Sequence, residues 1–179
     1  MMKKVFRYIT FWIFQSKFFP GRNVLRKIME SKLRENCVFC KIIKGLEKAE
    51  ILYEDSHVIS ILDINPVNLG HALVIPKEHY ENFLSLPEGI YSHLLRALRI
   101  IAQAIMESVE PKPEGFNILS NNGFVAGQRI FHAHFHVIPR YSGDGLKFKP
   151  VVKRYAKGEI ERYANLIRQK INEPKTQII

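Results

Sequence analysis

The stretch RIFHAHFHVIPR, residues 129–140, constrains the fold more than any other part of the chain. Its three histidines, His132, His134 and His136, occupy every second position of an otherwise apolar segment. Side chains of a β-strand alternate between the two faces of a sheet, so this spacing predicts a strand. We therefore expect the histidines on one face and the apolar residues between them on the other.

Five short segments with alternating or continuous apolar patterns predict the strands of one sheet. They are ILYED (51–55), HVISILDI (57–64), HALVIP (71–76), GFNILSN (115–121) and the histidine segment, which stops at Pro139. Residues 84–111 predict a long helix, with Ser85 as its N-cap and Glu88 completing a capping box. Residues 158–171 predict an amphipathic C-terminal helix.

Together these elements predict an α+β domain, an antiparallel sheet of about five strands with one long helix packed on it and a C-terminal helix. We expect the histidines on the sheet face opposite the long helix, or in a cleft at the end of the sheet. Residues 37–145 would form this domain and residues 146–179 a basic C-terminal segment with its helix. Residues 1–36 would be a basic, aromatic N-terminal extension.

The positive charge of the chain is concentrated near its two ends. Residues 1–36 hold nine Lys and Arg against two acidic residues, and residues 145–179 hold nine against three, whereas residues 37–144 hold nine against twelve. A nucleic-acid-binding domain usually carries its basic stripe on the folded core, so we expect no specific nucleic-acid partner. Two cysteines are too few for a disulfide framework, which favours a reducing, cytoplasmic location.

The N-terminal extension contains the aromatic stretch VFRYITFWIFQSKFF, residues 5–19. Its uncharged run, residues 8–16, is too short to span a bilayer, which takes about 20 apolar residues. We favour Met29 as the true start, because globular sequence begins there. A basic amphipathic helix in contact with a membrane is the second interpretation. A secretion signal is the last, since no small-residue cleavage site follows.

The spacing of the three histidines predicts separate tasks for them. Positions two apart on a strand are ~6.6 Å apart and positions four apart ~13 Å. One zinc ion holds histidine nitrogens at ~2.0–2.1 Å, so His132 and His136 do not easily share a metal. Metal ligand and nucleophile or acid–base group are the tasks that suit imidazole near neutral pH. The loop SNNGFVAGQ (120–128) directly before them offers amides and two glycines, which suit a phosphate group.

Cys37 and Cys40 form a Cys-x-x-Cys motif, which supplies half of a tetrahedral zinc site. His79, just after the third predicted strand, and one end histidine of the triplet are candidates for the other two ligands. Two alternatives stay open at this point. One is a thioredoxin-type redox pair, which requires a βαβ setting that the predicted pattern lacks. The other is a pair of unreactive cysteines in the core.

In order and spacing these motifs resemble the histidine triad (HIT) superfamily of nucleotide hydrolases and transferases. The resemblance covers roughly residues 37–143 and implies a HIT-like fold, a purine nucleotide ligand and a homodimer. The segments that carry it are CVFCKIIKG (37–45), LYEDSHV (52–58), LDINPVNLGHALVIPKEHYENF (62–83), NILSNNGFVAGQRIF (117–131) and HAHFHVIPR (132–140).

The resemblance also implies a role for each matching residue. His134 would be the nucleophile that attacks the α-phosphorus and forms a covalent nucleotidyl-histidine. His136 would contact the phosphate and assist the leaving group, while His71 would orient the triad. Asp63 would bind the ribose hydroxyls. The remaining substrate-binding residues would be the phosphate-binding amides Asn121 and Gln128.

The zinc-containing members of the superfamily imply a structural zinc ion in this chain. Its ligands would be Cys37, Cys40, His79 and His132. Because the protein would fill all four coordination positions, no position stays open for a metal-bound water.

Arg129 stands where many members carry Ser or Thr, so the leaving group stays open: an amine, a nucleotide or another group. The uridylyltransferase branch has Gln at the position of His136, so the histidine favours hydrolysis over transfer. We predict a nucleotide hydrolase for purine nucleoside phosphoramidates, dinucleoside polyphosphates or adenylylated conjugates. The alternatives are a nucleotide-binding regulatory protein with incidental turnover and a zinc-dependent nucleic-acid-binding module. His57 and His93 receive no role.

Overall fold

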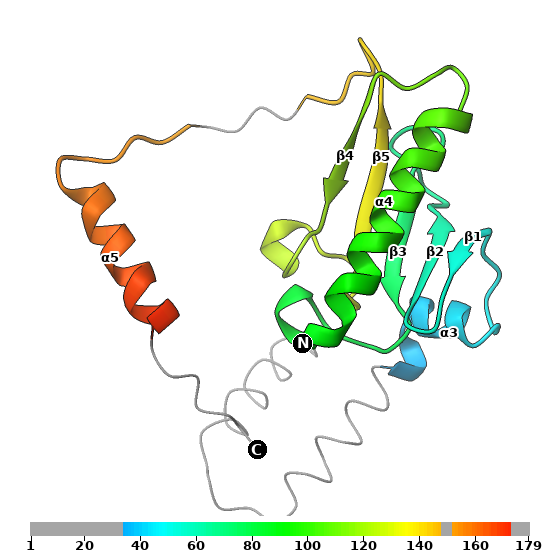
Figure 1. The fold of residues 1–179 in the computed structure, drawn as a ribbon, viewed down its shortest axis with the longest axis horizontal. Helices are drawn as coiled ribbons and strands as arrows, with labels where there is room; N and C mark the ends of the chain where they lie inside the picture. The colour runs from blue at the N-terminus through cyan, green and yellow to red at the C-terminus, as the bar shows by residue number, and fades with distance from the viewer. Residues whose placement is uncertain (1–33, 148–151, 173–179) are drawn as a thin grey trace, which may run out of the picture. The chain divides into compact units, whose positions relative to one another are not determined.

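The structure of the chain is a computed structural model that describes residues 34–147 and 152–172. The chain divides after Asp144 into two compact units. The first unit is an α+β fold in which helix α4 (Tyr91–Ser108) crosses one face of a five-stranded sheet (Figure 1). The prediction of fold class is therefore confirmed.

Every strand of the sheet pairs antiparallel with its neighbours, in the order β1-β2-β3-β5-β4. This order places the histidine-bearing strand β5 in the interior of the sheet, between β3 and β4. The strands are β1 (Ile51–Glu54), β2 (Val58–Leu62), β3 (Ala72–Pro76), β4 (Gly115–Leu119) and β5 (Phe135–Arg140).

The two faces of the sheet pack against different helices, because successive strand residues point to opposite sides. One face packs on α4, whose buried residues recur at helical spacing: Leu94, Ala97, Leu98, Ile101, Ala102 and Ile105. The other face packs on the short helix α3 (Val38–Ile43) through Phe39 and the two cysteines. His136 pairs with Leu73, which belongs to this second cluster. The expectation that the triad lies opposite the long helix is confirmed for His136.

The start of the long helix differs from the prediction. Asn82, not Ser85, is an N-cap residue, and it caps a 3₁₀ helix, η1 (Phe83–Ser85). Ser85 completes that capping box by accepting the Asn82 backbone N–H through its hydroxyl. A second 3₁₀ helix, η2 (Glu88–Ile90), follows, and α4 begins only at Tyr91. The prediction that Ser85 caps the long helix is therefore wrong.

Strand β5 is shorter than its alternating pattern predicts. Its ladder with β3 ends at the pair Val74 and Phe135, and Ala133 donates its N–H to the carbonyl of Tyr80 instead. Tyr80 lies in the loop after β3, so the chain of His132 and His134 follows that loop rather than a strand. The prediction of one strand through all three histidines is wrong for the first two.

The second unit contains helix α5 (Glu159–Asn172), which confirms the predicted C-terminal helix. None of its residues is buried. Among the described residues, no helix is both long and apolar enough to cross a membrane. The interpretations of residues 1–33 fall outside the described residues, and the boundaries at residues 36 and 145 stay predictions.

Candidate active site and metal centre

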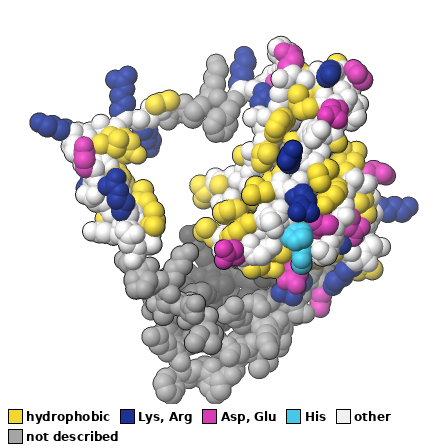
Figure 2. All heavy atoms as spheres, viewed as in Figure 1, with side chains coloured by type: hydrophobic (Ala, Val, Ile, Leu, Met, Phe, Trp, Pro, Cys, Tyr) yellow, Lys and Arg dark blue, Asp and Glu magenta, His cyan; other side chains and the backbone are white. Residues whose placement is uncertain are grey.

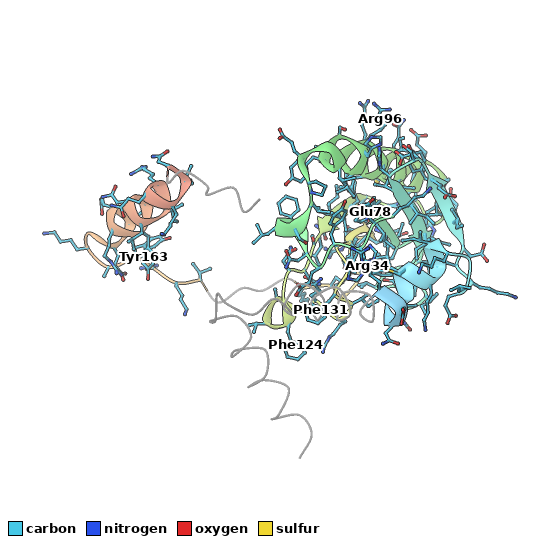
Figure 3. All side chains as sticks on the ribbon, turned by 90° about the horizontal axis from the view of Figure 1, so that it is seen from below. Arg34, Glu78, Arg96, Phe124, Phe131 and Tyr163 are labelled. Atoms are coloured by element: carbon cyan, nitrogen blue, oxygen red, sulfur yellow. The ribbon has the colours of Figure 1, made fainter. Side chains whose placement is uncertain are left out.

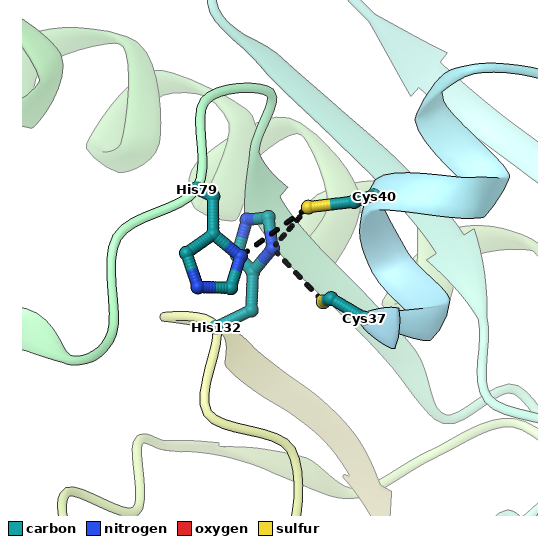
Figure 4. A group of neighbouring side chains, drawn as sticks. All are labelled: Cys37, Cys40, His79 and His132. Carbon is teal, nitrogen blue, oxygen red and sulfur yellow. Dashed lines mark hydrogen bonds between the residues drawn. The ribbon is translucent and has the colours of Figure 1, made fainter. Parts of the chain in front are cut away.

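Four sulfur and nitrogen ligands from three parts of the chain converge at one end of the sheet (Figure 4). Cys37 is the N-cap of α3 and Cys40 lies in that helix, while His79 follows β3 and His132 precedes β5. The ligand atoms of these four residues all lie within 4.8 Å of one another. The structure thus brings together the four residues that the resemblance implies as metal ligands.

The distances within this cluster suit a tetrahedral zinc ion. Sγ of Cys40 lies 3.3 Å from Nδ1 of His79 and 3.6 Å from Nδ1 of His132. Sγ of Cys37 lies 3.5 Å from the same His132 nitrogen. Bond lengths of about 2.3 Å to sulfur and about 2.0–2.1 Å to nitrogen place tetrahedral ligands about 3.6 Å apart. The donor set therefore fits zinc.

A backbone carbonyl orients the buried ring of His132. Its Nε2–H donates to the carbonyl of Pro76 at 2.9 Å, because a carbonyl can only accept. Nδ1 is then unprotonated and faces the sulfur atoms of Cys37 and Cys40. Histidine ligands of metals usually show such a second hydrogen bond, which fixes their tautomer.

The cysteines fit a metal site better than a redox pair. Burial, followed by the neighbouring Cys37, raises the pKa of Cys40 to about 11. A thiol with such a pKa is a poor nucleophile at neutral pH, whereas a bound metal ion deprotonates its thiol ligands outright. The sheet pairing is antiparallel throughout, unlike the βαβ setting of a thioredoxin-type motif.

A chain of hydrogen bonds fixes the protonated nitrogen of His136. The backbone N–H of Val67 donates to Nδ1 of His71 at 3.2 Å, so neutral His71 carries its proton on Nε2. That Nε2–H donates to Nδ1 of His136 at 3.0 Å. Neutral His136 therefore carries its own proton on Nε2 and is a hydrogen-bond donor for a ligand.

Burial keeps both of these histidines neutral at pH 7. It is the main cause that lowers the pKa of His136 to about 4, and the neighbouring His134 and His71 lower it further. Burial also lowers the pKa of His71, against the opposing effect of Asp63. The Oδ2 of Asp63 lies 3.6 Å from Nδ1 of His71.

His134 has the opposite tautomer. Its Nδ1–H donates to the carbonyl of His132 at 2.7 Å, so the lone pair lies on Nε2. Burial lowers the pKa of His134, which keeps that lone pair free at neutral pH. The ring contacts Phe39 and His136, with centroid distances of 5.2 Å and 5.0 Å. His134 is thus positioned as a nucleophile.

His134 and His136 line a pocket of about 430 Å³, a volume typical of small-molecule sites. Apolar side chains from α3, the sheet and the segment before β5 form much of its wall: Val38, Phe39, Ile42, Ile61, Leu73 and Ile130. Its charged and polar residues are Glu47, Lys48, Asp63, Asn65, Asn121 and Arg129. The lining offers an apolar surface for a ring system of a ligand and polar side chains for a charged group of the same ligand.

The structure brings most of the sequence-predicted substrate residues to this pocket. Asp63 lies on its lining, where its Oδ1 accepts the backbone N–H of Asn65 at 2.8 Å. Asn121 also lies on the lining. His71 is 2% exposed and reaches the pocket only through His136.

Gln128 is not brought to the pocket lining. The residue is 1% exposed, and its Nε2 donates to the carbonyls of Glu81 and Ile130 at 2.7 Å and 3.1 Å. Its Oε1 accepts the backbone N–H of Gly123 at 2.7 Å. The side chain therefore anchors the loop of residues 120–128, a position unlike that of a phosphate-binding amide.

Arg129 lies on the pocket lining although its neighbour is buried. The 3₁₀ helix η3 (Phe124–Ala126) ends at Gly127, whose φ of 90° is readily adopted only by glycine. The chain then turns Gln128 inward and leaves Arg129 exposed at the pocket. The guanidinium carbon of Arg129 lies 5.9 Å from the ring centroid of Phe124.

The pocket wall that α3 supplies was not predicted from the sequence. Val38, Phe39 and Ile42 recur at the spacing of one helix face beside the cysteines, and this was the available signal. No such signal marks Glu47 and Lys48, which precede β1. The backbone groups of Val67, Pro76 and His132 that fix the histidine tautomers have no signature in side-chain identity.

Comparison with known proteins identifies the family. The HIT domain matches residues 44–143, and the chain belongs to the HIT family. An uncharacterised HIT-like protein of Methanocaldococcus jannaschii is 47% identical over 109 residues, which are 61% of this chain and 82% of that protein. The crystal structure of a HIT family protein from Bacillus anthracis has a TM-score of 0.69 and 41% identity, covering 76% of this chain and 97% of its own.

Three further relatives have names that state an activity or a ligand. An adenylylsulfatase of Arabidopsis thaliana is 40% identical over 130 residues, which are 73% of this chain and 65% of that protein. An adenosine 5′-monophosphoramidase of Candida albicans is 38% identical over 107 residues, which are 59% of this chain and 70% of that protein. The crystal structure of a zinc-bound histidine triad family protein from Mycobacterium smegmatis has a TM-score of 0.55 and 34% identity, covering 77% of this chain and 99% of its own.

Proposed function

We propose that this protein hydrolyses nucleotides at the α-phosphate through a covalent histidine intermediate. One observation carries the proposal: in a single pocket, His134 offers an unprotonated Nε2 while His136 offers a protonated one. A nucleophile and a hydrogen-bond donor for the phosphate or the leaving group are then present together at neutral pH.

In the first step, Nε2 of His134 attacks the α-phosphorus. A bond from phosphorus to Nε2 forms as the bond to the leaving group breaks, and the electron pair departs with that group. A phosphoramidate reacts in its N-protonated form, so its amine leaves neutral. Nδ1 keeps its proton, and the carbonyl of His132 faces the positive charge of the imidazolium. Water then attacks phosphorus and loses a proton to the solvent, the bond from phosphorus to Nε2 breaks with its electron pair returning to Nε2, and AMP leaves.

We propose an adenylyl compound as substrate: a purine nucleoside phosphoramidate, a dinucleoside polyphosphate or another adenylylated conjugate. The apolar wall around Phe39 suits the base, and Asp63 is held in place to accept ribose hydroxyls. Asn121 is available to the phosphate. The named activities of the Arabidopsis and Candida relatives, both on adenylyl compounds, support this class.

We also propose a structural zinc ion held by Cys37, Cys40, His79 and His132. Bound there, the ion would join α3 to the segments after β3 and before β5. It would fix His132, whose carbonyl orients the nucleophile. The zinc in the Mycobacterium relative supports this assignment.

The test of the proposed function is intact-protein mass spectrometry after rapid quenching. We expect wild type incubated with adenosine 5′-phosphoramidate to carry a transient adenylyl adduct, and His134→Ala to carry none. The variant should lose at least about 10³-fold in kcat/KM. Equilibrium AMP binding and zinc content serve as controls for folding of the variant. AMP binding without adduct or turnover in wild type would instead support a nucleotide-binding regulatory protein.

We propose a homodimer as the working form. β4 is an edge strand of the sheet, and together with α4 it lines an apolar groove that includes Leu95, Met106, Phe116 and Ile118. Figure 2 shows hydrophobic side chains gathered on the face that carries α4. An exposed edge strand with apolar neighbours is suited to pair with the same strand of a second copy.

A further inference from the structure

Arg129 is a charged side chain of the pocket that the proposed mechanism leaves unused. It lines the same pocket as His134 and His136 and is exposed. Among the described residues, no ion pair engages its guanidinium, whose recorded contact is the ring of Phe124. Phe124 is itself 71% exposed, so this contact lies at the surface. The positive charge is therefore available to a ligand.

A positive charge beside the scissile bond affects neutral and anionic leaving groups differently. An amine leaves neutral, so a cation beside it contributes little. A sulfate, phosphate or carboxylate leaves as an anion, and negative charge grows on its oxygens as its bond to phosphorus breaks. A guanidinium meets two such oxygens with two parallel N–H donors, which strengthens the interaction as that charge develops.

Other groups of the pocket do not match this task equally well. His136 is neutral at pH 7 because its pKa is about 4, so it offers a hydrogen bond without a positive charge. Lys48 brings a point charge but stands next to Glu47, and both line the pocket. Arg129 directly follows the loop of residues 120–128 and lies in the segment that leads to His134.

We propose that Arg129 is a specificity residue that makes the enzyme favour adenylyl compounds with anionic leaving groups over those with amine leaving groups. This inference rests on the proposed function. In the reaction, His134 takes the adenylyl group, the bond from phosphorus to the leaving oxygen breaks, and the electron pair stays on that oxygen. The guanidinium stabilises the departing anion, and no proton has to be supplied.

The test compares two substrates that differ only in the leaving group: adenosine 5′-phosphosulfate and adenosine 5′-phosphoramidate. We expect Arg129→Gln to lower kcat/KM for the phosphosulfate by about tenfold to a hundredfold. For the phosphoramidate it should change kcat/KM by less than about twofold, and the affinity for AMP should stay the same. Arg129→Lys should lie between wild type and Arg129→Gln, because it keeps the charge without the paired donors.

Arg96 provides the matched control. It is an exposed arginine of α4, and Figure 3 shows it at the opposite side of the fold from Phe124. Arg96→Gln removes the same charge and should leave both substrates unaffected. A selective loss in Arg129→Gln alone supports the inference.

Two results would overturn the inference. Equal losses for both substrates in Arg129→Gln, or no loss for either, would remove Arg129 from leaving-group selection while leaving the hydrolase assignment intact. A wild-type protein inactive on both substrates would overturn the proposed function, and this inference with it. The two failures are therefore distinguishable.

Discussion

At the scale of single residues, Gln128 could either bind phosphate or anchor its loop, and the sequence alone does not distinguish these two roles. Its buried amide bonds three backbone groups, those of Glu81, Gly123 and Ile130. We expect Gln128→Ala to lower the free energy of unfolding by about 1–3 kcal/mol, because these groups lose their partner inside the protein. Thermal or urea unfolding measures the loss.

The same variant tests the phosphate-binding role that the resemblance implies for Gln128. A direct phosphate ligand, when removed, would weaken AMP binding and leave stability nearly unchanged. Asn121→Ala is the comparison, since Asn121 lines the pocket. We expect Asn121→Ala to weaken AMP binding and Gln128→Ala to act mainly on stability; the reverse pattern would restore Gln128 as a ligand.

The clustering of the predicted site residues was predictable where it depends on side-chain identity. The four proposed zinc ligands and the pocket residues Asp63 and Asn121 come together as their motifs indicate. The orientation of the His134 and His136 rings was not predictable. It depends on the N–H of Val67 and the carbonyl of His132, and every residue except proline has both groups.

At the scale of elements, the turn between β1 and β2 is joined to α4 by one carboxylate. Asp55 accepts backbone N–H groups from His57 and Val58 and lies 3.0 Å from Nδ1 of His93 in the helix. Burial alone would raise the pKa of Asp55, but the hydrogen bond from His93 and those from the turn lower it to about 2. His57 and His93, which received no role from the sequence, thus belong to a structural link.

This link makes stability depend on pH. The pKa of Asp55 is lower in the folded protein than in the unfolded chain, where it is about 3.9. Its contribution is therefore fully present above about pH 4 and is lost as the pH falls towards 2. We expect Asp55→Asn to be less stable than wild type by about 1 kcal/mol at pH 7, allowing for solvent screening, and equally stable near pH 2.

Unfolding by urea at a series of pH values measures this difference. Glu54→Gln is the control, because Glu54 forms a half-exposed pair with Lys77 at 2.6 Å. Such surface pairs contribute roughly 0–1 kcal/mol, and this one does not involve α4. A stability gap between wild type and Asp55→Asn that persisted unchanged at pH 2 would contradict the assignment.

The boundaries of the elements show where sequence patterns stop being informative. Alternation located all five strands, and helical spacing located α4 and α5. The start of β5 is set by the last residue pair of its ladder with β3. That pairing depends on two segments that are far apart in the sequence, so the pattern of one segment does not predict it. The start of α4 was misplaced because Asn82 and Ser85 cap a separate 3₁₀ turn whose local pattern is that of a helix N-terminus.

The proposed zinc ion gives a prediction that joins three elements. Removal of metal by a chelator should lower the thermal midpoint markedly and loosen α3, because Cys37 and Cys40 lie at the start of that helix. Cys40→Ser should bind less zinc than wild type and show little further loss with chelator. Metal analysis by mass spectrometry and melting curves measure both effects; equal stability with and without chelator would exclude a structural ion.

At the scale of the whole molecule, the proposed homodimer depends on the edge of the sheet. Ile118 is 49% exposed on β4 and lines the apolar groove beside α4. We expect Ile118→Asp to shift the mass in solution from dimer to monomer, because a buried unpaired carboxylate strongly disfavours an interface. Sedimentation or light scattering measures the change.

Ile51→Asp is the matched control for this experiment. Ile51 is 54% exposed on β1, the opposite edge strand of the same sheet. The same charge placed there should leave the dimer intact. A monomeric wild type, or dissociation caused by both variants, would contradict an interface at β4.

His132 links the proposed metal centre to the proposed nucleophile: its Nδ1 faces the cysteine sulfur atoms, and its carbonyl accepts the Nδ1–H of His134. A ligand that holds the His132 ring in place therefore also affects the position of the His132 carbonyl, and the reverse. Thermodynamic linkage requires such an effect to be reciprocal. If an ion in the cysteine cluster strengthens nucleotide binding by some factor, a bound nucleotide must tighten retention of the ion by the same factor. The binding of metal and the binding of nucleotide would then be coupled through one residue, His132.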